Sequence, residues 1–112
     1  MIIAVPVSNK KLAVHFGHCE EFALIEVDED AKKIVSTDYI VSPSHQPGML
    51  PPFLRDKWAS IIIAGGMGQR AQAIFAANNI QVMTGAPDDH PVSIVQAYLN
   101  GELVAGENLC DH

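Results

Sequence analysis

The segment SIIIAGGMG, residues 60–68, decides the fold of this 112-residue chain. Its first five residues are the most apolar run in the sequence and predict a buried central strand. The strand ends at Gly65-Gly66-Met67-Gly68, after which apolar residues recur at helical spacing, as at Ala71 and Phe75. A buried strand, a glycine-rich turn and a helix in this order are typical of an α/β protein.

Four further strands are predicted around this segment. Residues 2–7 (IIAVPV) form an apolar run of strand length. Residues 22–27 and 33–41 predict two strands that pair antiparallel across the acidic turn between them. Residues 80–83 predict the fifth strand, so the sequence supplies a three-stranded meander followed by two more strands.

Three helices are predicted in the second half of the chain. A short one lies near Leu50 to Trp58, and a second follows the glycine-rich turn and ends at Asn78-Asn79. The third runs from Pro91 to Leu99, and Gly101 closes it. The order βββ and then αβαβα predicts a single α/β domain over residues 1–112, a five-stranded mixed sheet with helices on its faces.

This topology predicts one sheet edge for a ligand. We suppose that strands one, three, four and five are parallel and that strand two is antiparallel to them. The C-terminal ends of those four strands and the N-terminal end of strand two then lie at the same edge of the sheet. Ligands of open α/β sheets bind outside the carboxyl ends of parallel strands. The segments expected there are residues 8–21, 42–48, 65–68 and 84–90.

Most of the histidines fall within these edge segments. Imidazole and thiolate together suit zinc, copper or iron. The C-terminal Cys-Asp-His adds a further pair, provided that a tail of about ten residues, at roughly 3.3 Å each, reaches back to the edge. The predicted metal ligands are His15, His18, Cys19, His45, His90, Cys110 and His112.

Several of these residues have an alternative interpretation. In HFGHC, residues 15–19, Phe16 could fill the core and Gly17 make a turn, leaving the polar residues solvated. A lone loop histidine such as His45, or His90 before Pro91 at a helix start, is common without a ligand role.

The glycine-rich turn also has two interpretations. It could hold an anion on free helix N–H groups, with Arg70 attracting the anion toward it, or it could be a tight turn. Met67 could be a soft ligand or a packing residue. The predicted cofactor-binding residues are Gly65, Gly66, Met67, Gly68 and Arg70.

Composition excludes several classes of function. With 13 acidic against 7 basic residues and a net charge of −6, the balance opposes nucleic-acid binding. No run approaches the roughly 20 apolar residues of a membrane span. The N-terminus lacks a basic leader, so we expect a cytoplasmic protein with reduced thiols and no membrane partner.

Catalysis is not indicated by the sequence either. The chain has neither a Gly-x-Ser-x-Gly nor an HExxH motif. The sheet order resembles the ribonuclease H-like arrangement, but the first strand carries no Asp or Glu for two-metal phosphoryl chemistry. We therefore expect a protein that is not an enzyme.

A set of ordered motifs resembles the dinitrogenase iron-molybdenum cofactor biosynthesis family over nearly the whole chain. The motifs are HFGHC (15–19), HQPG (45–48), IAGGMG (63–68) with RA (70–71), TGA (84–86), YLNGEL (98–103) and CDH (110–112). The resemblance implies a ribonuclease H-like motif fold without nuclease activity. It also implies binding or carriage of a metal-sulfur cluster, either an iron-molybdenum cofactor precursor or, as in the related orange-protein branch, a molybdenum-copper sulfide.

In that family the HFG loop and the glycine-rich loop are thought to line the cluster. The resemblance thus implies a site at His15, His18, Cys19 and Gly65 to Gly68, with His45 and the Cys110/His112 tail as features of a subgroup. Many members stand alone in organisms that do not fix nitrogen, so nitrogenase assembly does not follow for this chain.

The expected function is that of a non-catalytic scaffold or carrier. Its ligand would be an iron-sulfur, iron-molybdenum or molybdenum-copper cluster or a precursor, received from or passed to assembly or acceptor proteins. The alternatives are a simple zinc, iron or copper module without sulfide, and a regulatory module whose glycine loop binds a small anion. The sequence leaves the metal, the sulfide and the oligomeric state open.

Overall fold

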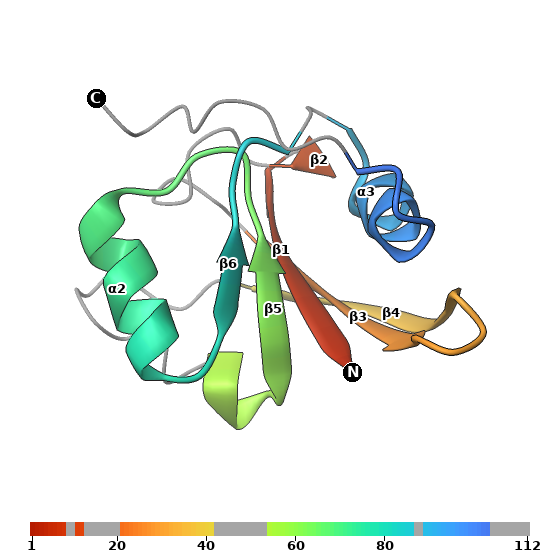
Figure 1. The fold of residues 1–112 in the computed structure, drawn as a ribbon, viewed down its shortest axis with the longest axis horizontal. Coiled ribbons are helices and arrows are strands. Elements are labelled where there is room, and N and C mark those ends of the chain that lie inside the picture. Colours follow the sequence, from red (N-terminus) through yellow and green to blue (C-terminus); the bar gives the residue numbers. More distant parts are fainter. Residues whose placement is uncertain (9–10, 13–20, 42–53, 87–88, 104–112) are drawn as a thin grey trace.

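The apolar runs of the sequence form a mixed sheet, which the computed structural model shows with helices on both faces (Figure 1). The structure describes residues 1–8, 11–12, 21–41, 54–86 and 89–103. The elements are β1 (Ile2–Ser8), β2 (Lys11–Leu12), β3 (Glu21–Asp28), β4 (Lys33–Val41), β5 (Ala59–Ile63), α2 (Gln69–Ala77), β6 (Gln81–Met83) and α3 (Pro91–Leu99).

The sheet has the order β4-β3-β1-β5-β6. The β1–β3 and β3–β4 pairs are antiparallel, whereas the β1–β5 and β5–β6 pairs are parallel. The five predicted strands and their directions are therefore confirmed. A sixth strand, β2, was not predicted: it pairs antiparallel with the end of β1, Val7 opposite Leu12. A strand of two residues is too short to show a period, so no sequence pattern could indicate β2.

Side chains of alternating strand positions form two core clusters, one on each face of the sheet. On one face Phe22, Ile62 and the glycine-turn residue Met67 pack with Phe75 of α2. On the other face the odd-numbered residues of β1 pack with Ile94 and Val95 of α3. Each helix therefore buries its apolar side against a different face (Figure 1).

The helix ends follow their local signals. Helix α2 ends at the C-cap Asn78, followed by Asn79 at φ +62°, and α3 spans the predicted residues. Gly101, at φ +74°, adopts the left-handed conformation expected after a helix. Residues 54–56 are helical, and the start of that predicted helix lies outside the described residues. None of the described helices is long and apolar enough to cross a membrane.

Candidate functional site

The ends of four parallel strands and the start of β3 meet at one edge of the sheet, as the topology predicted. Glu21, the first residue of β3, is paired with Val7 of β1 on one side and with Val41 of β4 on the other. On the other half of the sheet, Ile63 at the end of β5 is paired with Met83 at the end of β6. We call this the carboxyl edge, marked by Val7, Glu21, Val41, Ile63 and Met83.

The glycine-rich turn begins at the carboxyl edge and is fixed there by backbone hydrogen bonds. Ala64 N–H donates to Met83 C=O at 2.8 Å, and Gly85 N–H donates to Gly65 C=O at 2.9 Å. Ala86 N–H donates to Ala64 C=O at 3.2 Å. These bonds continue the pairing of β5 and β6 beyond the strands, so the predicted segments 65–68 and 84–86 lie side by side.

Helix α2 starts directly after this turn, and no side chain of the described residues caps its N-terminus. Its N-cap is Gly68, which supplies no side-chain hydrogen bond, and its first turn contains no acidic residue. The first N–H groups of a helix lack partners within the helix and carry a partial positive charge. Arg70 in the same turn is exposed, so this end of α2 has the electrostatics of an anion site.

The space around Gly68 would admit a side chain. Its φ of −64° is open to any L-residue, and a Cβ added there meets no atom within 4 Å. Neither the backbone conformation nor the packing therefore requires a glycine at this position. Because Gly68 has no side chain and is exposed, its backbone is accessible from the solvent.

Met67 is placed differently from its neighbours in the turn. Its side chain is 1% exposed and belongs to the core cluster that contains Phe22 and Phe75. Its carbonyl accepts a 2.8 Å hydrogen bond from Gln72 Nε2 in α2. Of the two predicted roles of Met67, soft metal ligand and packing residue, this placement favours the packing residue.

His90 is the one predicted metal ligand that the structure describes. It is the N-cap of α3, is exposed, and makes no side-chain cap hydrogen bond. The preceding residue, Asp89, accepts a 2.9 Å hydrogen bond through its carbonyl from Leu12 N–H of β2. His90 therefore lies next to the end of β2, where the segment carrying the HFGHC motif begins.

The remaining predicted ligands lie outside the described residues: His15, His18, Cys19, His45, Cys110 and His112. Within the described part of the chain, no three His, Cys, Asp or Glu side chains gather as a metal site. The predicted ligand set thus stays a prediction. The chemistry of that set, imidazole and thiolate, fits a soft or borderline metal.

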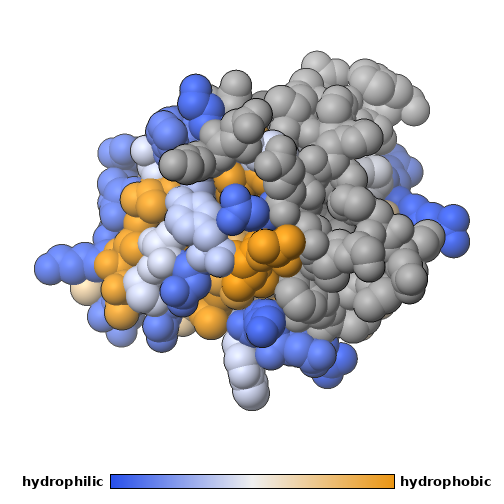
Figure 2. Space-filling view, turned by 180° about the vertical axis from the view of Figure 1, so that it is seen from behind, coloured by the Kyte–Doolittle hydropathy of each residue, from blue (hydrophilic) through white to orange (hydrophobic). Residues whose placement is uncertain are grey.

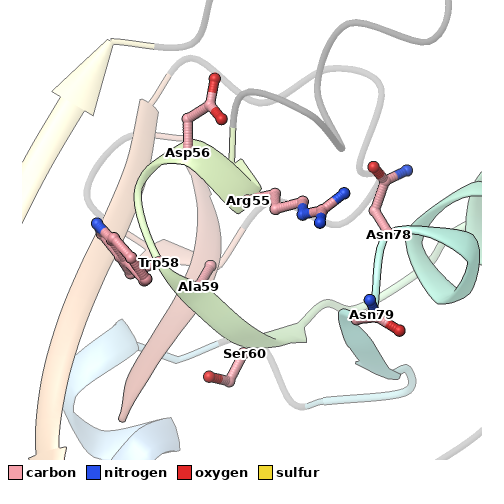
Figure 3. Close-up of a pocket in the computed structure, with 7 residues that line it drawn as sticks. All are labelled: Arg55, Asp56, Trp58, Ala59, Ser60, Asn78 and Asn79. Atoms are coloured by element: carbon pink, nitrogen blue, oxygen red, sulfur yellow. The ribbon is translucent and has the colours of Figure 1, made fainter.

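A half-open hollow of about 460 Å³ lies away from the carboxyl edge, at the start of β5 and the end of α2 (Figure 3). The Arg55 guanidinium points toward Asn78, whereas the Trp58 side chain points away from both. Trp58 is 81% exposed and has a φ of +66°. No sequence pattern indicated this hollow, because its residues come from separate segments and share no motif. The lining residues are Arg55, Asp56, Trp58, Ala59, Ser60, Asn78 and Asn79.

Comparison with known proteins supplies a family and a fold. The sequence profile of a family described as "Dinitrogenase iron-molybdenum cofactor" matches residues 1–101. An uncharacterized protein of Methanocaldococcus jannaschii is 29% identical over 85 residues, which cover 73% of this chain and 72% of the relative.

Two solved structures show the likeness in three dimensions. The protein PH0822 superposes with a TM-score of 0.85 at 25% identity, covering 94% of each chain. The apo form of the orange protein from Desulfovibrio gigas superposes with a TM-score of 0.71 at 20% identity, covering 96% of this chain and 93% of that protein. The second likeness shows the fold alone.

Proposed function

This chain belongs to the dinitrogenase iron-molybdenum cofactor family, and we propose that it is a non-catalytic carrier or scaffold for a metal-sulfur cluster or its precursor. The observation that supports the proposal is the carboxyl edge, along which the glycine-rich turn, the N-terminus of α2 and His90 lie. The predicted cargo is an iron-sulfur, iron-molybdenum or molybdenum-copper cluster, taken from or given to assembly or acceptor proteins.

The described residues suit a cargo whose outer sulfides are negatively charged. The N-terminus of α2, which has no side-chain cap, carries a partial positive charge that attracts such an anion, and Arg70 adds a full positive charge in the same turn. The absence of a side chain at Gly68 lets the cluster approach the backbone. In this proposal the two imidazoles and the thiolate of the HFGHC motif supply metal ligands, and His90 joins them.

The lack of catalysis is part of the same proposal. Among ribonuclease H-like proteins, nuclease chemistry needs carboxylates on the sheet to hold metal ions. The order β4-β3-β1-β5-β6, with β3 alone antiparallel to its parallel neighbours, supports a ribonuclease H-like origin of the fold. The central strand β1 has the sequence IIAVPVS, which contains no carboxylate.

Anaerobic reconstitution tests the proposal directly. The apo protein is incubated with iron and sulfide, or with tetrathiomolybdate and copper, and then desalted. Charge-transfer bands together with stoichiometric metal and acid-labile sulfide in the protein fraction are the expected result, and His15→Ala and Cys19→Ala should lose them. A protein that stays colourless and metal-free under every condition contradicts the carrier function.

Two arginine variants test the role of the open helix end. Arg70→Gln at the carboxyl edge should lower the retained cluster several-fold, whereas Arg55→Gln should leave it unchanged. The two arginines are a matched pair, since both are exposed and the hollow that Arg55 lines lies at the start of β5. Equal loss in both variants would show a general effect of net charge, and the placement of the cluster at α2 would then be wrong.

A simple transition-metal module without sulfide is the second candidate, and Glu21 favours it. This half-buried carboxylate lies at the carboxyl edge between β1 and β4. It attracts a metal cation and repels an anionic cluster. Elemental analysis of anaerobically purified protein separates the candidates: stoichiometric metal without acid-labile sulfide supports the simple module.

A further inference from the structure

Helix α3 ends in a turn that contains a chemically reactive pair of residues. Asn100 is the C-cap of α3, with φ −81° and ψ −4°, and Gly101 follows at φ +74°. Both residues are exposed, and an Asn-Gly pair occurs nowhere else in the sequence. Such a pair can lose ammonia without an enzyme, because a glycine has no Cβ to hinder the approach of its nitrogen to the preceding side-chain amide.

The closing hydrogen bonds of α3 hold this pair in an unreactive arrangement. Gly101 N–H donates to Tyr98 C=O at 3.1 Å, and Glu102 N–H donates to Ala97 C=O at 2.8 Å. These two bonds are the pattern that closes a helix before a left-handed glycine. The reaction requires the Gly101 nitrogen to give up its proton and face the Asn100 side chain. An intact last turn prevents both, since that N–H is held by Tyr98.

Gln96, one turn earlier in α3, restrains the side chain of Asn100 directly. Its Nε2 donates to Asn100 Oδ1 at 3.2 Å and to the backbone carbonyl of Lys32 at 3.0 Å. Lys32 belongs to the turn between β3 and β4, which lies beside α3 in Figure 1. One glutamine therefore joins the reactive asparagine, the last turn of α3 and the hairpin.

This restraint is weak because it is surrounded by solvent. Asn100 and Lys32 are exposed, and the turn end of the β3–β4 hairpin, at the left of Figure 2, is covered by polar residues. Water competes for both partners of such a hydrogen bond, so its net contribution is small. Helix ends also open more easily than helix centres. The last turn of α3 is therefore held closed, but it opens at intervals.

We propose that Asn100 is a modification site, which deamidates through a cyclic imide with Gly101 when the last turn of α3 opens, and that Gln96 limits the rate. The Gly101 nitrogen attacks Cγ of Asn100. A bond forms between these two atoms, the Cγ–Nδ2 bond breaks, and Nδ2 leaves as ammonia with the proton of Gly101. Water then opens the imide at either carbonyl and gives aspartate or isoaspartate, with no oxidant or reductant. This inference is independent of the proposed function.

The isoaspartate product cannot restore the end of the helix. It places an additional methylene group in the main chain before Gly101, so the N–H groups of Gly101 and Glu102 no longer match their two acceptors. Three side chains at this end of α3 pack against the core on that face of the sheet: Tyr98, Leu99 and Leu103. Because ammonia is lost, the change is irreversible, and it loosens the cover of one sheet face.

Peptide mapping by mass spectrometry tests the site and its protection. The full chain is incubated at neutral pH, once folded and once in urea, and the peptide with Asn100 is followed as its amide becomes an acid. We expect conversion to be about ten-fold slower in the folded protein, because the last turn must open first. Equal rates would overturn the protection by the fold, and an Asn100 that stays unchanged in urea would overturn the site.

The C-cap of α2 is an internal comparison in the same sample. Asn78 has the same position at a helix end, but Asn79 and then Ile80 follow it. The side chains of these two residues hinder attack by the backbone nitrogen, so this peptide should convert more slowly than that of Asn100 in urea. Conversion at the same rate would refute the role assigned to Gly101.

Two glutamine variants form a matched pair for the role of Gln96. Gln72 and Gln96 are both half-buried in a helix, and the Nε2 of each donates to a backbone carbonyl, that of Gln72 to Met67 at 2.8 Å. Gln96→Ala should raise the rate in the folded protein about three-fold, as expected for one lost hydrogen bond, whereas Gln72→Ala should leave it unchanged. Equal acceleration in both variants, or none in Gln96→Ala, would overturn this role.

Hydrogen exchange tests the effect on the helix end. The isoaspartate form is compared with Asn100→Asp, which has the same mass and charge but a normal main chain. The amides of Gly101 and Glu102 should exchange about ten-fold faster in the isoaspartate form, because their closing bonds are lost. Equal exchange in the two forms would refute the predicted opening of α3.

Discussion

Substitution of Met67 separates its two predicted roles, cluster ligand and packing residue. The side chain is 1% exposed and packs in the cluster of Phe22 and Phe75. Met67→Ala leaves a cavity in this core and should lower the free energy of unfolding by about 2–5 kcal/mol. Met67→Leu nearly conserves the volume and should cost less than about 1.5 kcal/mol. Since a domain of this size has a stability of roughly 5–15 kcal/mol, the alanine variant loses a large fraction of it.

The stability is measured by urea unfolding followed by far-UV circular dichroism. Fluorescence is a poor probe, because the single tryptophan, Trp58, is already 81% exposed in the folded protein. Cluster retention is then measured on the leucine variant, which should match the wild type. Normal stability with lost cluster in Met67→Leu would show that the thioether is a ligand. A cost below about 1 kcal/mol for Met67→Ala would refute the packing role itself.

Three further substitutions test separate parts of the reasoning. Glu21→Gln removes the carboxylate at the carboxyl edge and should increase retention of an anionic cluster, measured as acid-labile sulfide; reduced retention would favour Glu21 as a ligand. His90→Ser adds an N-cap hydroxyl to α3 and should raise unfolding stability by about 0.5–1 kcal/mol, while a loss of bound metal would identify His90 as a ligand. Gly101→Ala should cost about 1 kcal/mol in urea unfolding, because φ is +74° although no atom lies within 4 Å of the added Cβ; an unchanged midpoint would mean that the left-handed conformation is not kept.

The fold was predictable wherever a period or a cap was present. Three isoleucines before two glycines identified the buried strand and its end, and Pro91 and Gly101 fixed α3 at both ends. The directions of the later strands followed from the connections, since a short turn reverses the chain and a helical crossover keeps its direction. The antiparallel pairing of β1 and β3 was a supposition about the topology, because the segment between them is neither a short turn nor a helix, and the structure confirms it. The β4 bulge was not predictable, because a single extra residue leaves the alternation of a half-exposed edge strand ambiguous.

The position of the candidate site in the fold could be predicted from the sequence, whereas the roles of its individual side chains could not. Strand directions alone placed residues 65–68 and 84–86 together, and the hydrogen bond from Gly85 to Gly65 confirms this. The role of Met67 depended on which way one side chain turned, and no pattern in a glycine-rich loop encodes that. The hollow at Arg55 was missed for a related reason: its lining residues, Arg55 and Asn78 among them, come from separate segments that only the folded chain brings to one place.

The placement of α2 and α3 limits where this protein can bind anything. Each helix buries its apolar side on one face of the sheet, so both faces are used for stability. Sites for a cargo are then left at the ends of the strands, and the carboxyl edge, where α2 begins, is the one that the proposed cargo uses. A carrier with this arrangement can exchange cargo at the carboxyl edge without disturbing either packed face, and Arg70→Gln should therefore lower cluster retention while the free energy of unfolding changes by less than about 0.5 kcal/mol.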